Sequence, residues 1–109
     1  MKSRRLFLPV LAVALLTTAV PAAEAVADTC LGLAPTIVGT AGPDEIVGTP
    51  GPDVIIAGAG DDLIRGLGGD DVICGGPGND TLLGGAGADR LIGGRGNDLL
   101  NGQAGADLL

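Results

Sequence analysis

Aliphatic and polar positions along residues 39–109 repeat with a period of nine. Counted from Gly39, this part of the chain divides without gap or insertion into eight repeats, the last of which stops one residue short at Leu109. Position eight is Ile or Leu in every repeat, position six is always Asp, and position four is always Gly. Compositional drift would enrich Gly, but it would not keep three residue types at fixed positions through eight repeats. The period therefore indicates a repeat architecture.

Each repeat has a turn half and a strand half. Positions one to six hold Gly and other turn formers, which tolerate positive φ. Positions seven to nine are strand-like, as in Val54-Ile55-Ile56 and Val72-Ile73-Cys74. Because successive strand side chains point to opposite faces, we expect position eight to face inward and positions seven and nine to face outward.

A strand of three residues cannot bury its inner face alone, so the repeats are expected to stack. Turn, strand, turn and strand close one coil in two repeats, or 18 residues, which places odd and even repeats in two separate sheets. The chain is therefore predicted to be an all-β solenoid, a parallel β-roll in the form of a two-sheet right-handed β-helix. Its thin core is expected to consist of Ile46, Ile64, Leu82 and Leu100 facing Ile55, Ile73, Leu91 and Leu109.

The residues before the repeats have the features of an export signal. A basic start precedes an apolar run over residues 6–20, and Ala23-x-Ala25 fits the small-residue cleavage rule. Cleavage after Ala27 fits equally well. The alternative is a retained membrane anchor, but the run is short for a spanning helix, which needs about 20 apolar residues. We therefore interpret residues 1–25 as a cleaved signal peptide, which predicts a secreted, extracellular chain with no membrane span.

Removal of residues 1–25 leaves 12 acidic and three basic residues, a net charge of −9. So acidic a chain repels itself. It is not expected to bind nucleic acid or an anionic membrane surface, because both attract Lys and Arg. A bound cation would partly neutralise this negative charge.

The repeat resembles the nonapeptide of repeats-in-toxin (RTX) proteins, Gly-Gly-x-Gly-x-Asp-x-U-x with U aliphatic. Residues 75–101 match it at every position, and the resemblance covers residues 39–109. It implies that Ca²⁺ ions lie between stacked turns and are bound by peptide carbonyls and by the position-six carboxylates, with at most six such sites. The implied ligands are Asp44, Asp62, Asp80 and Asp98 on one edge and Asp53, Asp71, Asp89 and Asp107 on the other.

The alternative is that these aspartates are only turn residues on a solvated edge. Position five is equally turn-like and varies freely, whereas position six is never replaced, even by Asn. A need for charge explains this better than a need for a turn. The first two repeats depart from the family pattern, with Thr40 and Thr49 at position two and Pro43 and Pro52 at position five. We expect their turns to be stiffer and to bind calcium less well.

Residues 26–38 are predicted to form an N-terminal cap. Thr36-Ile37-Val38 falls in strand register with the even repeats, and the preceding segment could fold back over the apolar outer face of their sheet. This would bring Cys30 near Cys74, and an exported chain meets an oxidising environment, so a disulfide is expected. Two free buried thiols are the alternative.

These features favour a secreted calcium-binding module with a structural or binding role. The alternative is a detached or truncated repeat module of a larger secreted enzyme, toxin or adhesin. An enzyme is not expected, since the mature chain has no His, Ser, Tyr or Lys. The chain has no regular Thr ladder, which argues against an ice-binding solenoid, and its strict position-eight aliphatics argue against a disordered acidic segment. The sequence indicates calcium ions as partners and leaves a protein partner unknown.

Overall fold

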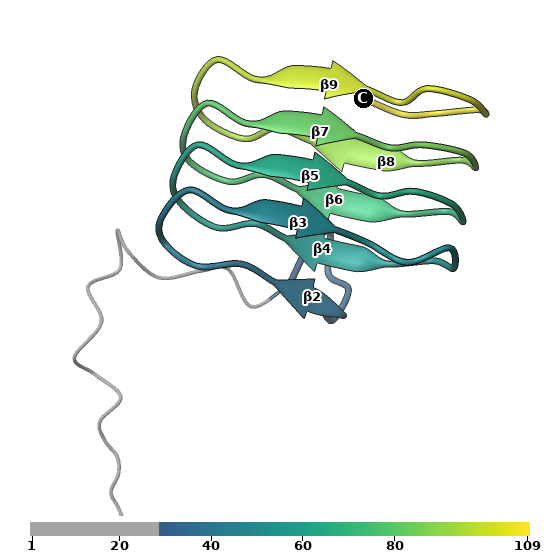
Figure 1. Ribbon diagram of the computed structural model, residues 1–109, viewed down its shortest axis with the longest axis horizontal. Coiled ribbons are helices and arrows are strands. Elements are labelled where there is room, and N and C mark those ends of the chain that lie inside the picture. The colour runs from purple at the N-terminus through teal and green to yellow at the C-terminus, as the bar shows by residue number, and fades with distance from the viewer. Residues whose placement is uncertain (1–28) are drawn as a thin grey trace, which may run out of the picture.

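The computed structural model of the protein describes residues 29–109, which form a stack of short parallel strands joined by turns (Figure 1). The expected signal peptide, residues 1–25, lies outside the described residues. The strands are β2 (Ile37–Val38), β3 (Glu45–Val47), β4 (Val54–Ile56), β5 (Leu63–Arg65), β6 (Val72–Cys74), β7 (Thr81–Leu83), β8 (Arg90–Ile92) and β9 (Leu99–Asn101). In this part of the chain no helix is long and apolar enough to cross a membrane.

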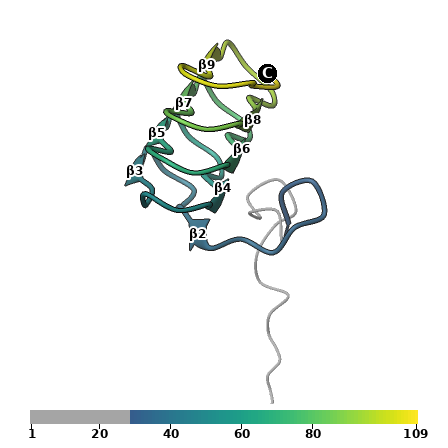
Figure 2. The same ribbon diagram turned by 90° about the vertical axis from the view of Figure 1, so that its right-hand side faces the viewer.

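The strands form two four-stranded parallel sheets, which Figure 2 shows as separate layers joined by the turns. One sheet has the order β2-β4-β6-β8 and the other the order β3-β5-β7-β9. Neighbouring strands pair residues 18 apart, as in Ile55 with Ile73 and Ile46 with Ile64. Two repeats therefore make one coil, and the predicted parallel β-roll is confirmed.

The core is the single layer of position-eight side chains between the two sheets. Ile55, Ile64, Ile73 and Leu82 are fully buried, and Leu91 is nearly so. Because each strand has only two or three residues, one side chain per strand faces inward, and the core becomes larger only when coils are added.

The predicted core is wrong at its C-terminal end. Leu109 is 63% exposed, and Leu100 is only partly buried against the core. The eighth repeat forms no strand and adds only an isolated bridge between Arg90 and Leu108. No described coil packs beyond it, so its position-eight side chain has no second row to contact.

The segment before the repeats packs on the outer face of the even-repeat sheet. β2 extends that sheet beside β4, in the register of the repeats, and Ile37 packs against the core. Cys30 is fully buried in a second apolar cluster with Ile56 and Val72. A disulfide joins Cys30 to Cys74 across 44 residues of sequence, which confirms the expected pairing.

Candidate metal centre

The turns of repeats three to eight share one backbone conformation. Positions two and four have positive φ in all of these repeats, and glycine fills nearly all of those positions. Leu67 (φ 72°) and Gln103 (φ 67°) adopt it at position two although it is unfavourable for residues with a Cβ. Neighbouring turns also approach closely, since a Cβ on Gly76 would lie 2.7 Å from the carbonyl oxygen of Gly58 in the preceding coil. In these six repeats, Leu67 and Gln103 therefore adopt the same turn shape as the glycines at the equivalent positions.

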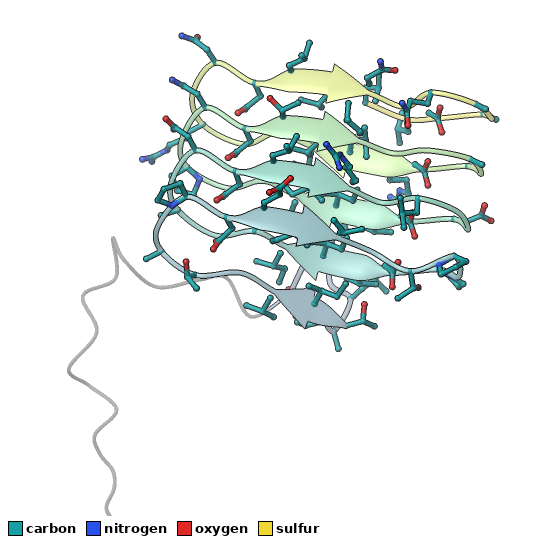
Figure 3. The ribbon with its side chains drawn as sticks, viewed as in Figure 1. Atoms are coloured by element: carbon teal, nitrogen blue, oxygen red, sulfur yellow. A yellow bond between two sulfur atoms is a disulfide. The ribbon has the colours of Figure 1, made fainter. Side chains whose placement is uncertain are left out.

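The position-six aspartates line both turn edges, where Figure 3 shows carboxylates recurring from coil to coil. The backbone N–H of Asp53 donates to Oδ1 of Asp71 at 2.8 Å, and that of Asp71 donates to Oδ1 of Asp89 at 2.8 Å. The other edge is built in the same way. The bonds link Asp44, Asp62, Asp80 and Asp98 on one edge and Asp53, Asp71, Asp89 and Asp107 on the other. The structure thus brings the eight residues together in the two groups that the repeat period predicts.

The second carboxylate oxygen has no partner in four of these residues. Oδ2 is buried and accepts no hydrogen bond in Asp62, Asp71, Asp80 and Asp89. These side chains are at most 3% exposed, so water does not compensate for the missing bond. A buried polar atom without a partner is costly and calls for an explanation.

In the turns of Asp71, Asp80 and Asp89, the unpaired oxygen faces a carbonyl of the next coil across the space at position one. A Cβ built on Gly66 would lie 2.5 Å from Oδ2 of Asp71 and 2.6 Å from the carbonyl oxygen of Gly84. The same arrangement recurs at Gly75 and Gly84. Two oxygens with no donor between them form a cradle that suits a cation, and glycine at position one keeps it open.

The electrostatics of the buried carboxylates also favour a cation. Burial, together with the negative charge of the neighbouring aspartates of the ladder, raises the pKa of Asp62 and of Asp71 from the ordinary 3.8 to about 6, although the backbone N–H bond to each side chain lowers it. Burial likewise raises the pKa of Asp80 and Asp89, although the backbone N–H bond to each side chain opposes this effect. The ionised carboxylates are therefore destabilised where they lie, and a positive charge beside them would offset that penalty.

The remaining position-six residues differ from these four. Both carboxylate oxygens of Asp44 and Asp53 accept hydrogen bonds from the threonine at position two of their own turn. Asp98 and Asp107 lie in the last two turns and are half-buried. The four aspartates of the central turns are thus the ones whose Oδ2 is both buried and without a hydrogen-bond partner.

A second ladder at position five escaped the sequence analysis. Oδ1 of Asp61 accepts the backbone N–H of Asn79 at 2.8 Å, and Oδ1 of Asn79 accepts that of Asn97 at 2.9 Å. Asp70 accepts the N–H of Ala88 in the same way on the other edge. Position five looks variable along the chain, but comparison of every second repeat shows Asp, Asn and Asn in succession on one edge.

Main-chain oxygens must supply most of the ligands of any ion here. Among residues 29–109, no three His, Cys, Asp or Glu side chains come together as a metal-binding group. One carboxylate per turn with neighbouring carbonyls is an all-oxygen set, which suits the hard cation Ca²⁺ better than zinc or copper.

Comparison with known protein families agrees with this geometry. The family described as RTX calcium-binding nonapeptide repeat matches residues 38–73, 47–82 and 75–109. The chain belongs to this family. Its RTX repeats form a calcium-binding β-roll module, which supports Ca²⁺ as the ion. No curated protein and no solved structure matches the chain.

Proposed function

We propose that this chain is a secreted, non-catalytic module in which the position-six aspartates hold calcium between stacked turns, and that its folding depends on calcium. The observation that carries the proposal is the buried, unpaired Oδ2 of Asp62, Asp71, Asp80 and Asp89. In the Asp71 turn, the cradle at Gly66 places this oxygen beside a carbonyl of the next coil. These residues would supply the shared oxygens of sites between successive turns.

Without an ion, this fold sets buried carboxylates in a row. The backbone bonds between successive coils require each aspartate to stack on its like-charged neighbour, and the thin aliphatic core provides little to offset that repulsion. A calcium ion would replace repulsion with shared ligation. Since the site exists only when two coils are stacked, binding and folding become one event.

The ion is expected to be calcium rather than magnesium. Calcium accepts six to eight oxygens in flexible geometry at about 2.3–2.6 Å, whereas magnesium demands tighter octahedral geometry and gives up its waters reluctantly. A cradle of one carboxylate and several carbonyls suits the first ion. Because each site must first be assembled, we expect an affinity of about 10⁻⁴–10⁻³ M, typical of extracellular modules.

Composition supports a non-catalytic role outside the cell. The chain has no His or Tyr, and its single Ser and single Lys lie within residues 1–25. Ser, His, Lys and Tyr are therefore missing from the repeats as nucleophiles or bases, and the one cysteine of the repeats, Cys74, is held in the disulfide. Export is supported by the signal-like pattern of residues 1–25 and by the Cys30–Cys74 disulfide, since disulfides persist in oxidising compartments.

Far-UV circular dichroism of the mature chain tests the proposal. Spectra are recorded in chelator, in millimolar magnesium and in millimolar calcium. We expect a disordered spectrum in the first two solutions and a β spectrum in the third. A full β spectrum in chelator would show that folding does not depend on calcium.

A further inference from the structure

The first two turns differ from the six that follow in their backbone. Thr40, Gly42, Thr49 and Gly51 occupy positions two and four of these turns, and none of them has positive φ. All later turns have positive φ at both positions. A Cβ on Gly42 or Gly51 would meet only the threonine hydroxyl of its own turn, at 3.9 Å. These two turns are therefore a second conformational class within the same repeat.

In the first two turns, the threonines donate hydrogen bonds to carboxylate oxygens of a kind that has no partner in the central turns. Thr49 donates its N–H to Oδ2 of Asp53 at 2.7 Å and its hydroxyl to Oδ1 at 3.0 Å. Thr40 bonds Asp44 in the same way, at 2.8 Å for both bonds. In both turns, an N–H donor thus occupies the Oδ2 that remains unpaired in Asp62, Asp71, Asp80 and Asp89.

The position of Pro35 explains why a hydroxyl is useful in the second turn. In later coils, Oδ1 of each aspartate accepts the N–H of the residue 18 positions earlier. For Asp53 that residue is Pro35, which has no N–H to donate. Thr49 supplies the missing donor from within the turn, so the carboxylate at this end of the stack does not depend on a preceding coil.

We infer that Thr40 and Thr49 close the first two turns without an ion, so that calcium binding begins at the third repeat. The inference rests on the proposed function and decides which turns take part in it. The carboxylate and carbonyl oxygens approach each other at Gly48 in the Asp53 turn as they do at Gly66, but the N–H of Thr49 directs its positive end at Oδ2 of Asp53 and opposes a cation there. No donor faces Oδ2 of Asp71. Without the first turn of each edge, three turns and two gaps remain on each edge, which gives four ions rather than the six that the repeat count allows. Four is also the number of buried, unpaired Oδ2 atoms.

A matched pair of substitutions on one edge tests this assignment. Asp53→Asn and Asp71→Asn each remove one negative charge from adjacent coils of the full mature chain. In Asp53→Asn, the new side-chain amide retains an acceptor for the N–H of Thr49 and can donate to the threonine hydroxyl, so that turn is expected to persist. Bound calcium is counted by equilibrium dialysis at saturating calcium.

We expect about four ions for the wild type and for Asp53→Asn, one for each buried, unpaired Oδ2, and at least one fewer for Asp71→Asn. If Asp53→Asn loses as many ions as Asp71→Asn, the inference is wrong while the proposed function stands. If the wild type binds no calcium, the proposed function itself fails, and the inference fails with it.

The hydroxyl has its own test, which does not depend on counting ions. Thr49→Val removes the hydroxyl but keeps the N–H, and should lower the thermal midpoint of the calcium-loaded chain without changing the number of ions. Thr49→Ser should restore the midpoint. Thr81→Val, on the outer face of β7, is the control and should leave the midpoint unchanged. A Thr49→Val chain as stable as the control would overturn the role given to the hydroxyl.

Discussion

At the residue scale, the two oxygens of each central aspartate have different roles. Oδ1 of Asp71 accepts the N–H of Asp53 and so fixes the spacing of two coils, whereas Oδ2 accepts nothing. The sequence shows that Asp never gives way to Asn at position six, and for the central turns the structure supplies a reason. Asn could make the coil-to-coil bond equally well, but it would not bring a negative charge into the cradle.

The raised carboxyl pKa values predict how the calcium-free chain responds to pH. The pKa of Asp62 and of Asp71 is about 6 in the folded state and 3.8 ordinarily, so between these values the folded state binds more protons than the unfolded state. The free energy of unfolding in chelator should therefore rise as the pH falls from 7.5 through 6 toward 5. Circular dichroism in chelator should show a growing β signal over this range.

The matched control is the double variant Asp62→Asn/Asp71→Asn, whose pH response should be weaker because two of the titrating groups are gone. Calcium affinity should change in the opposite direction and fall below pH 6, because protons compete for Oδ2. A β signal in chelator that is independent of pH would contradict the burial of these carboxylates.

Ala57 predicts that the calcium sites differ in affinity. It is the one position-one residue that is not glycine, and it is fully buried in the turn that carries Asp62. At the equivalent Gly66, a Cβ would lie between the carboxylate and the carbonyl of the next coil. Ala57→Gly should therefore strengthen calcium binding at one site by several-fold, as measured by isothermal titration. Ala59→Gly, in the same turn, should not, and equal behaviour of the two variants would show that the methyl group does not restrict the cradle.

At the scale of the strand and the turn, the sequence predicted the strands better than the turns. Strands β3 to β9 occupy positions seven to nine as expected, because a period of nine with one inward aliphatic leaves no other register. The two classes of turn could not be predicted from the sequence. Gly-Thr in the first two repeats differs from the family pattern in the sequence, but the hydrogen bonds from the threonine to the carboxylate depend on backbone angles that residue types alone do not determine.

The conformation of Leu67 could not be predicted from the sequence either, because leucine rarely adopts the positive φ that it has here. Replacing it with glycine should stabilise the calcium-loaded fold by about 1 kcal/mol, because a left-handed conformation costs a residue with a Cβ about 1–2 kcal/mol. Thermal or chemical unfolding in calcium measures the gain. Ala86→Gly is the control: Ala86 donates to the carbonyl of Leu67 without itself having positive φ, and it should lose stability on substitution. A loss in both variants would indicate that Leu67 contributes more by packing than it costs in strain.

At the scale of the whole molecule, the disulfide and the ions stabilise different parts of the stack. Cys74 ends β6, so the bond to Cys30 encloses β2, both threonine turns and two of the four proposed ligand aspartates, Asp62 and Asp71. The covalent tie thus includes the end where ligation is absent, and calcium acts from the third repeat onward. Each coil contacts only its neighbours, so order at one end favours order in the next coil.

This division predicts that the disulfide sets how much calcium the fold needs. Closing a loop of about 45 residues contributes roughly 4 kcal/mol through the unfolded state. Spread over about four ions, this is about 1 kcal/mol per ion, so Cys30→Ala/Cys74→Ala should raise the calcium midpoint of folding about fivefold. Circular dichroism during calcium titration measures the midpoint, and wild type held in reductant should match the variant. Identical midpoints with and without the disulfide would mean that the N-terminal coils are already ordered before calcium binds, independently of the covalent link.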